Sequence, residues 1–205
     1  MIAPLLSRAR AFAAADSGVA AVEMAFVAPV ALILLSVIVA SGMTLNAWRR
    51  TNAVAHTVTD LVSRTPNTTQ DANIAGAEDL AQSDLLTDLG LSQLVIFPSD
   101  PSTLQITITE IKIDNVKNTG TVVWSQGYNG GTPTACATVF NLNGNIATAG
   151  ATYMLATGVS YSFQPLGVVL NLPPMTLTSS ELLTIRYAPQ IVVTPVTDTT
   201  AFKQC

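Results

Sequence analysis

A run of apolar residues near the N-terminus constrains this chain more than any other feature. Between Val19 and Leu45 the sequence reads VAAVEMAFVAPVALILLSVIVASGMTL, which is 27 residues with a single charge at Glu23. At a rise of about 1.5 Å per residue, a helix over this run would be about 40 Å long. That length is enough to cross a hydrocarbon core of about 30 Å. The run therefore predicts one transmembrane helix over residues 19–45, in contact with the lipid bilayer.

The segment before this run differs from a conventional secretory signal. Residues 1–18 read MIAPLLSRARAFAAADSG. A secretory signal has an apolar core of about 7–15 residues and a small-x-small cleavage site after it, and neither feature fits the longer run. Arginines flank the run on both sides, so the charge comparison leaves its orientation open; they are Arg8, Arg10, Arg49 and Arg50.

Glu23 needs a physical reason to stand in an apolar helix, because a desolvated carboxylate without a partner is costly. One interpretation is an interfacial residue in the first helical turn, where the helix dipole stabilises a negative charge. A second interpretation depends on Gly18, which lies five residues earlier, where the polar leader meets the apolar run.

The stretch from Gly18 to Glu23, GVAAVE, resembles a prepilin processing site. The wider stretch GVAAVEMAFVAPVALILL resembles the TadE-like minor pseudopilins of tight-adherence (Flp) pilus systems, and the similarity covers residues 16–45. Met24 departs from the family pattern, in which an aromatic residue often follows the glutamate. Pro29 matches the proline that the family carries in its apolar run, and we expect it to kink or loosen the helix.

The resemblance implies a processing route and an assembly contact. A prepilin peptidase would cut between Gly18 and Val19, so that residues 1–18 are a cleaved leader. The new amine at Val19 of one subunit would then form an assembly salt bridge with the Glu23 carboxylate of another. The protein would be a minor pseudopilin that takes part in the assembly or initiation of a Tad/Flp-type pilus. Its partners would be other minor pseudopilins, the major Flp pilin, the peptidase and the pilus assembly platform.

The same resemblance implies a location in the bacterial inner membrane, with a single pass and a periplasmic C-terminal head. Whether the protein also enters the extracellular pilus stays open. The rival hypothesis is an uncleaved signal-anchored periplasmic module that binds a ligand or an envelope protein. Cleavage after Gly18 would distinguish the two hypotheses.

The remaining sequence predicts an α+β head at residues 67–205, preceded by a periplasmic continuation of the long helix over residues 46–66. The continuation carries an apolar stripe at helical spacing, made of Ala47, Val54, Val58, Leu61 and Val62. Residues 72–89 predict a second helix that stops at Gly90. Alternating residues predict antiparallel strands packed on the outer helix. They are a hairpin over residues 103–125 around Asn118, Thr119 and Gly120, with its second strand at 121–125, and further strands at 153–163 and 182–187. A change of apolar phase near Thr109 and Glu110 predicts a bulge or a bend.

Two cysteines, Cys136 and Cys205, are far from the apolar run and on the same side of it. In an exported domain they favour one disulfide, and the alternative is two unpaired thiols. No phosphate-binding loop, nucleophile elbow or metal-spaced Cys/His set is present in the sequence, so we predict no enzyme, no cofactor and no metal. The nine Lys and Arg residues form no dense patch, which argues against nucleic-acid binding.

Overall fold

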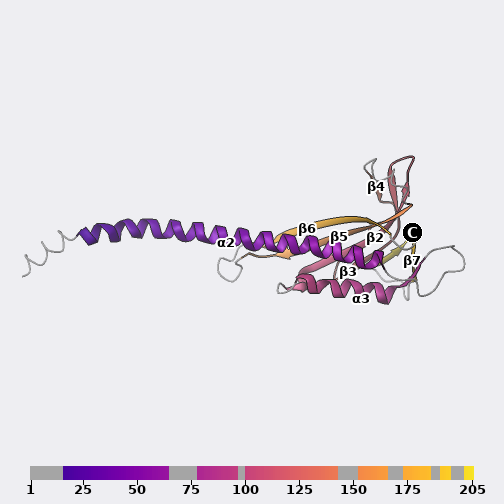
Figure 1. Cartoon of the computed structure of the whole chain (residues 1–205), viewed down its shortest axis with the longest axis horizontal. Helices are drawn as coiled ribbons and strands as arrows, with labels where there is room; N and C mark the ends of the chain where they lie inside the picture. The colour runs from indigo at the N-terminus through magenta and orange to yellow at the C-terminus, as the bar shows by residue number, and fades with distance from the viewer. Residues whose placement is uncertain are drawn as a thin grey trace, which may run out of the picture. The chain divides into compact units, whose positions relative to one another are not determined.

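The computed structural model describes residues 16–64, 78–96, 100–142, 152–165, 173–185, 190–194 and 201–205. The chain divides into two compact units, Met1–Thr44 and Leu45–Cys205, and each is described by itself. The long helix α2 (Asp16–Ser63, 48 residues) contributes to both units (Figure 1). Together with an antiparallel sheet in the second unit, it confirms the predicted α+β class.

In the first unit, the large apolar side chains of α2 are exposed from Val22 to Met43. In the second unit the helix changes character, because one stripe of its side chains enters a core. Four of the five predicted stripe residues are buried. The fifth, Leu61, is partly exposed, since it lies beside the stripe rather than within it.

The second unit is built on a six-stranded antiparallel sheet with the strand order β4-β3-β2-β5-β6. A last short strand, β8, pairs with β3 along the same outer edge as β4. These strands are β2 (Leu104–Asp114), β3 (Thr119–Tyr128), β4 (Val139–Asn141), β5 (Tyr153–Phe163), β6 (Met175–Thr184) and β8 (Phe202–Gln204). A separate two-stranded parallel sheet joins β1 (Glu78–Ala81) to β7 (Ile191–Thr194).

The main core lies between one face of the large sheet and two helices, α2 and α3 (Gln82–Ser92) (Figure 1). The short 3-10 helices η1 (Gln93–Ile96) and η2 (Pro101–Thr103) connect α3 to β2. The buried side chains of this core include Val54 and Val58 of α2, Leu85 and Leu89 of α3, and Leu104, Ile106, Ile108, Trp124, Leu155 and Val159 of the sheet. A buried hydrogen bond from Thr59 Oγ1 to Thr157 Oγ1, 2.8 Å long, also joins α2 to β5.

The predicted phase change in β2 has a clear physical origin. Residues Leu104, Ile106 and Ile108 face the main core, whereas Ile111 and Ile113 belong to a smaller apolar cluster with Met154. The pairing of β2 with β3 shifts register between Glu110 and Ile111, at the position where the sequence predicted a bulge or a bend. One strand therefore supplies apolar residues to both faces of the sheet.

Two secondary-structure predictions differ from the structure. Of the helix predicted over residues 72–89, residues 72–77 lie outside the described part of the chain, and residues 78–81 form strand β1 instead, because they pair with β7 from much later in the sequence. Gly90 does not stop α3, which continues to Ser92. A Cβ atom at this position would lie 3.3 Å from Tyr128 Oη, so the glycine serves close packing against β3.

Candidate functional site

The predicted processing segment forms part of helix α2. Gly18 and Glu23 are both exposed, and a Cβ atom built on Gly18 would have no neighbouring atom within 4 Å. The side chain of Val19 lies outside the described residues. In a helix, residues four apart lie on one face, so the backbone nitrogen of residue 19 and Glu23 are on the same side of α2.

Glu23 has no ion-pair partner among the residues that the structure describes. The side chains around it in the sequence are apolar and exposed, including Val22, Met24 and Phe26. An exposed carboxylate on an exposed apolar helix is therefore available for contact with a second molecule. The proposed assembly salt bridge stays a prediction, since a single chain does not test it.

The apolar part of α2 is suited to a lipid environment. A single described helix, Ala20–Ser63, is long and apolar enough to cross a membrane, and the most apolar part of it is wholly exposed in the isolated chain. Its few hydroxyls are satisfied internally: Ser36, Ser41 and Thr44 each donate to the carbonyl four residues earlier, at 2.7–2.8 Å. Such back-bonding removes the cost of placing a hydroxyl in hydrocarbon.

Pro29 lies inside α2, and the helix is continuous around it. Because proline has no N–H, the carbonyl of Ala25 loses its usual helical donor there. The kink that we expect at Pro29 stays a prediction.

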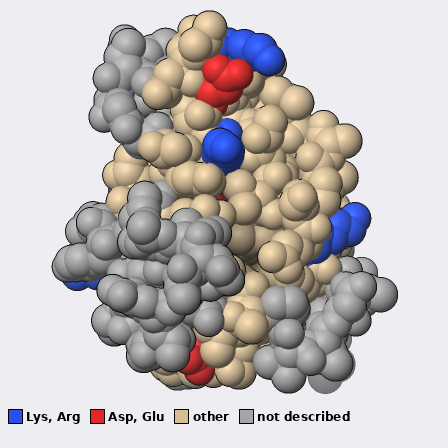
Figure 2. Space-filling model, turned by 90° about the vertical axis from the view of Figure 1, so that its right-hand side faces the viewer, with Lys and Arg blue, Asp and Glu red and all other residues tan. Residues whose placement is uncertain are grey.

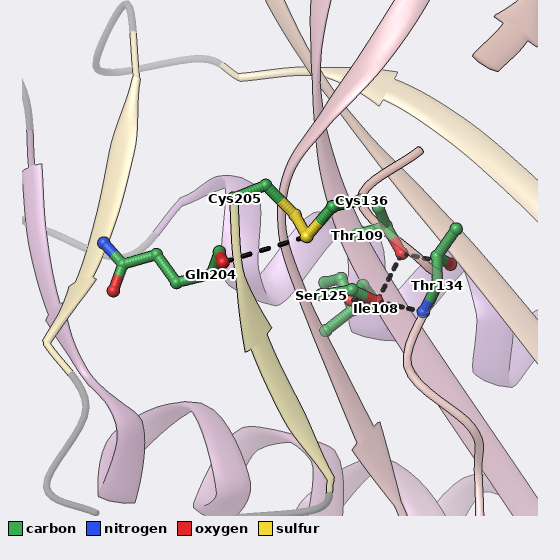
Figure 3. The surroundings of a disulfide bond; sticks show 7 residues. All are labelled: Ile108, Thr109, Ser125, Thr134, Cys136, Gln204 and Cys205. Atoms are coloured by element: carbon green, nitrogen blue, oxygen red, sulfur yellow. Dashed lines mark hydrogen bonds between the residues drawn. A yellow bond between two sulfur atoms is a disulfide. The ribbon is translucent and has the colours of Figure 1, made fainter. Parts of the chain in front are cut away.

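The two cysteines form a disulfide that closes the C-terminal end of the chain onto the segment after β3 (Figure 3). The Cα atoms of Cys136 and Cys205 are 5.5 Å apart, and 69 residues separate them in the sequence. The Cys205 N–H donates to Val123 O at 2.7 Å, so the disulfide lies directly beside the edge of β3.

A network of hydroxyls supports this region from within the sheet (Figure 3). The oxygens of Thr109 and Ser125, which face each other across β2 and β3, are 2.8 Å apart. Thr134, two residues before Cys136, approaches Thr109 Oγ1 at 2.9 Å and donates its N–H to Ser125 Oγ at 2.9 Å. The segment that carries Cys136 is therefore anchored to the sheet independently of the disulfide.

Glu110 is a notable residue that sequence reasoning missed. It is fully buried on the core side of β2, and its Oε1 accepts a 2.9 Å hydrogen bond from the Ile191 N–H of β7. Its cross-strand partner Trp124 donates its indole N–H to the Ile191 carbonyl at 2.9 Å. Burial raises the pKa of Glu110 to about 8, although hydrogen bonds from Ile191 and Trp124 partly oppose this shift. The sequence could have indicated this burial, because Glu110 lies two residues after Ile108 in β2 and therefore faces the same side of the sheet as Ile106 and Ile108.

The opposite face of the large sheet has a shallow hollow of about 460 Å³. Hydroxyl groups line much of it, together with the apolar side chains of Phe140, Leu142 and Leu182. No group of three His, Cys, Asp or Glu residues that could hold a metal ion occurs in the described part of the chain. The single histidine, His56, lies 3.8 Å from Glu181 through Nδ1 and Oε1, on the exposed side of α2.

Basic side chains are dispersed over the described surface that Figure 2 displays. The Lys and Arg side chains on that face are separated from one another, and an acidic group lies between two of them near the top of the view. This face therefore lacks the concentrated positive surface that nucleic-acid binding uses.

Comparison with known proteins bears on the N-terminal segment. A family model described as TadE-like protein matches residues 18–60. No curated protein and no solved structure matches the chain. The family match begins at Gly18 and contains Glu23 and the whole apolar run, and it confirms the predicted resemblance. Over residues 18–60 this chain is therefore similar to TadE-like proteins.

Proposed function

We propose that this protein is a minor pseudopilin that takes part in the assembly or initiation of a Tad/Flp-type pilus, after a prepilin peptidase removes residues 1–18. One observation carries the proposal: Gly18 and Glu23 lie five residues apart on an exposed helix at the start of a TadE-like apolar run. The role is structural, and its partners are other minor pseudopilins, the major Flp pilin and the assembly platform. In this proposal α2 crosses the bacterial inner membrane once, and the head is periplasmic.

The surroundings of Gly18 allow processing to be tested without disturbing the fold. Because a Cβ atom there meets no other atom of the chain, Gly18→Ala should leave the fold intact and change the peptidase site alone. Gly42 lies in the same helix and also has no atom within 4 Å of a built Cβ. Gly42→Ala is therefore a matched control for the loss of a helical glycine.

The experiment is intact-mass analysis of the full chain expressed with and without its prepilin peptidase. We expect the wild type and Gly42→Ala to lose Met1 to Gly18 only when the peptidase is present, and Gly18→Ala to stay uncut. An uncut wild-type chain in the presence of the active peptidase would contradict the proposal. The protein would then be a signal-anchored module, and the hollow lined by hydroxyls would become its candidate binding surface.

A further inference from the structure

One end of the second unit is fixed near the point where the apolar run finishes. In α2, Trp48 and Arg50 follow Leu45 by three and five residues, or about 5 and 8 Å along the helix axis. Arg50 Nη1 donates to the carbonyl oxygen of Ile96 at 3.3 Å, so η1 lies beside this part of α2. If α2 spans a bilayer through its apolar run, the end of the head that carries η1 is close to the membrane surface.

Large apolar side chains are exposed at this end. Leu94 of η1 is 71% exposed, Leu91 in the last turn of α3 is 53% exposed, and Trp48 is 46% exposed. Met175, which is 44% exposed, belongs to the same end, because it pairs with Phe163 at the end of β5. We call Trp48, Leu91, Leu94 and Met175 the apolar tip.

The position of Met175 follows from the sheet register and the η helices. Strand β5 reaches Tyr161 opposite Leu104, the first residue of β2. Thr103 of η2 donates its hydroxyl to the Ser162 carbonyl at 2.9 Å. Since η2 directly precedes β2 and contacts η1, the end of β5 and the start of β6 lie at the η1 end of the unit.

The chain carries few charges near the apolar tip, and one of them is the exposed carboxylate of Asp100, which caps η2. From Leu91 to Ile96 the chain has no charged residue, and the acidic residues of α3, Asp84 and Asp88, lie on earlier turns. Arg49 is exposed beside Trp48. Tryptophan, exposed leucines and arginine are the residues that favour the headgroup layer, where rings and aliphatic chains enter the apolar boundary and guanidinium groups meet phosphates.

We propose that the apolar tip inserts into the headgroup layer of the membrane that α2 crosses, so that the head rests on the lipid surface. The proposal rests on the proposed function, in which α2 is a membrane helix. It selects lipid over a protein partner because Trp48 follows the apolar run by three residues in every copy of the chain, and the hydrogen bond from Arg50 to Ile96 keeps η1 beside this part of α2.

The test uses the full chain in lipid vesicles, with a nitroxide label on a cysteine introduced at one position at a time. The native cysteines are paired, which leaves the introduced thiol as the reactive one. Leu94→Cys reports on the apolar tip, and Ile38→Cys reports on the span. Val116→Cys is the matched control, because Val116 is an apolar side chain that is 92% exposed in the turn beyond the far end of β2.

Accessibility of each label to oxygen, which concentrates in lipid, is compared with its accessibility to a water-soluble nickel chelate. We expect the labels at 38 and 94 to favour oxygen and the label at 116 to favour the chelate. A label at 94 that behaves like the one at 116, while 38 favours oxygen, would overturn the docking and leave the membrane helix intact. Low access of both reagents to position 94 would mean that protein covers it, which also overturns lipid docking. A label at 38 that favours the chelate would overturn the membrane anchoring itself.

Discussion

At the scale of single residues, Glu110 has the most unusual environment in the head. Its carboxylate and the Trp124 indole together hold both backbone polar groups of Ile191, so they fasten β7 to the large sheet. The second carboxylate oxygen, Oε2, has no partner among the described residues. A buried acid with one satisfied oxygen prefers its neutral form, which explains the direction of its pKa shift.

This environment predicts a pH-dependent stability. In the folded protein the pKa of Glu110 is about 8, whereas the ordinary value is 4.5, so between these values the folded state keeps a proton that the unfolded state releases. The free energy of unfolding should therefore fall as the pH rises from about 4.5 to about 8, by up to about 1.4 kcal/mol per pH unit. Glu110→Gln should remove this contribution.

The measurement is urea unfolding of the full chain in detergent at several pH values. A Trp48→Phe background leaves Trp124, which lies beside Glu110, as the single tryptophan reporter. Below about pH 4.5 Glu110 is protonated in both the folded and the unfolded state. Any difference in stability between Glu110→Gln and the parent protein in that range is therefore unrelated to ionisation and provides an internal control. Parallel stability curves for the two proteins across the whole pH range would refute the prediction.

At the scale of elements, local patterns predicted the parts of the fold whose residues alternate clearly. The strand predicted over residues 153–163 matches β5, and the hairpin predicted over residues 103–125 corresponds to β2 and β3, of which β3 is longer than predicted at both ends. The last strand was predicted at 182–187, of which residues 186–187 lie outside the described part of the chain, whereas β6 spans Met175–Thr184. The start of β6 was missed because the polar residues 178–180 interrupt the alternation that Met175 and Leu177 begin. Strands β1, β4, β7 and β8 are three or four residues long and depend on partners distant in sequence, so no local period indicates them.

Strand β8 gives an element-scale prediction about the disulfide. Three register pairs hold β8 on β3, and the bond between Cys136 and Cys205 adds a covalent restraint at its end. In a Cys136→Ser, Cys205→Ser double variant, we expect faster hydrogen exchange at the amides of β8 and at residue 205. The loss of this loop closure could lower global stability by up to about 4 kcal/mol in the chain-entropy model.

Hydrogen exchange followed by mass spectrometry distinguishes local from global loosening. Peptides from β2 and β5, which pair with each other at the centre of the sheet, are the control, because β8 pairs with β3 and not with these two strands. Unchanged exchange in β8 of the double variant would mean that strand pairing and the network of Thr109, Ser125 and Thr134 hold this edge without the disulfide.

At the scale of the whole molecule, the two units differ in how far their sequences predict them. The segment at 18–60 matches the TadE-like family model, and the residues on which the predicted resemblance depends, Gly18, Glu23 and Pro29, lie within it. The head has no comparable motif. Its architecture depends on contacts such as the one between Glu110 and β7, 81 residues apart, which only the folded chain reveals.

Glu23 gives the prediction that belongs to the assembled state. Its carboxylate has no ion-pair partner in the described chain, so Glu23→Gln should fold and be processed as the wild type. In the assembly, the amide would leave the Val19 amine of a neighbouring subunit unpaired in a lipid environment. Breaking a buried pair in this way costs about 3–5 kcal/mol, which corresponds to at least about a hundredfold weaker association.

The measurement is the recovery of tagged variants with the pilus assembly platform and with sheared pili, in cells that lack the wild-type copy. Asp84→Asn, at an exposed acidic residue of α3, controls for the loss of one negative charge and should assemble normally. Glu23→Asp keeps the charge on a shorter side chain and should restore part of the association, because pairing depends on the carboxylate rather than on side-chain shape. Equal recovery of Glu23→Gln and the wild type would show that Glu23 serves only as an interfacial residue of its own helix, stabilised there by the helix dipole.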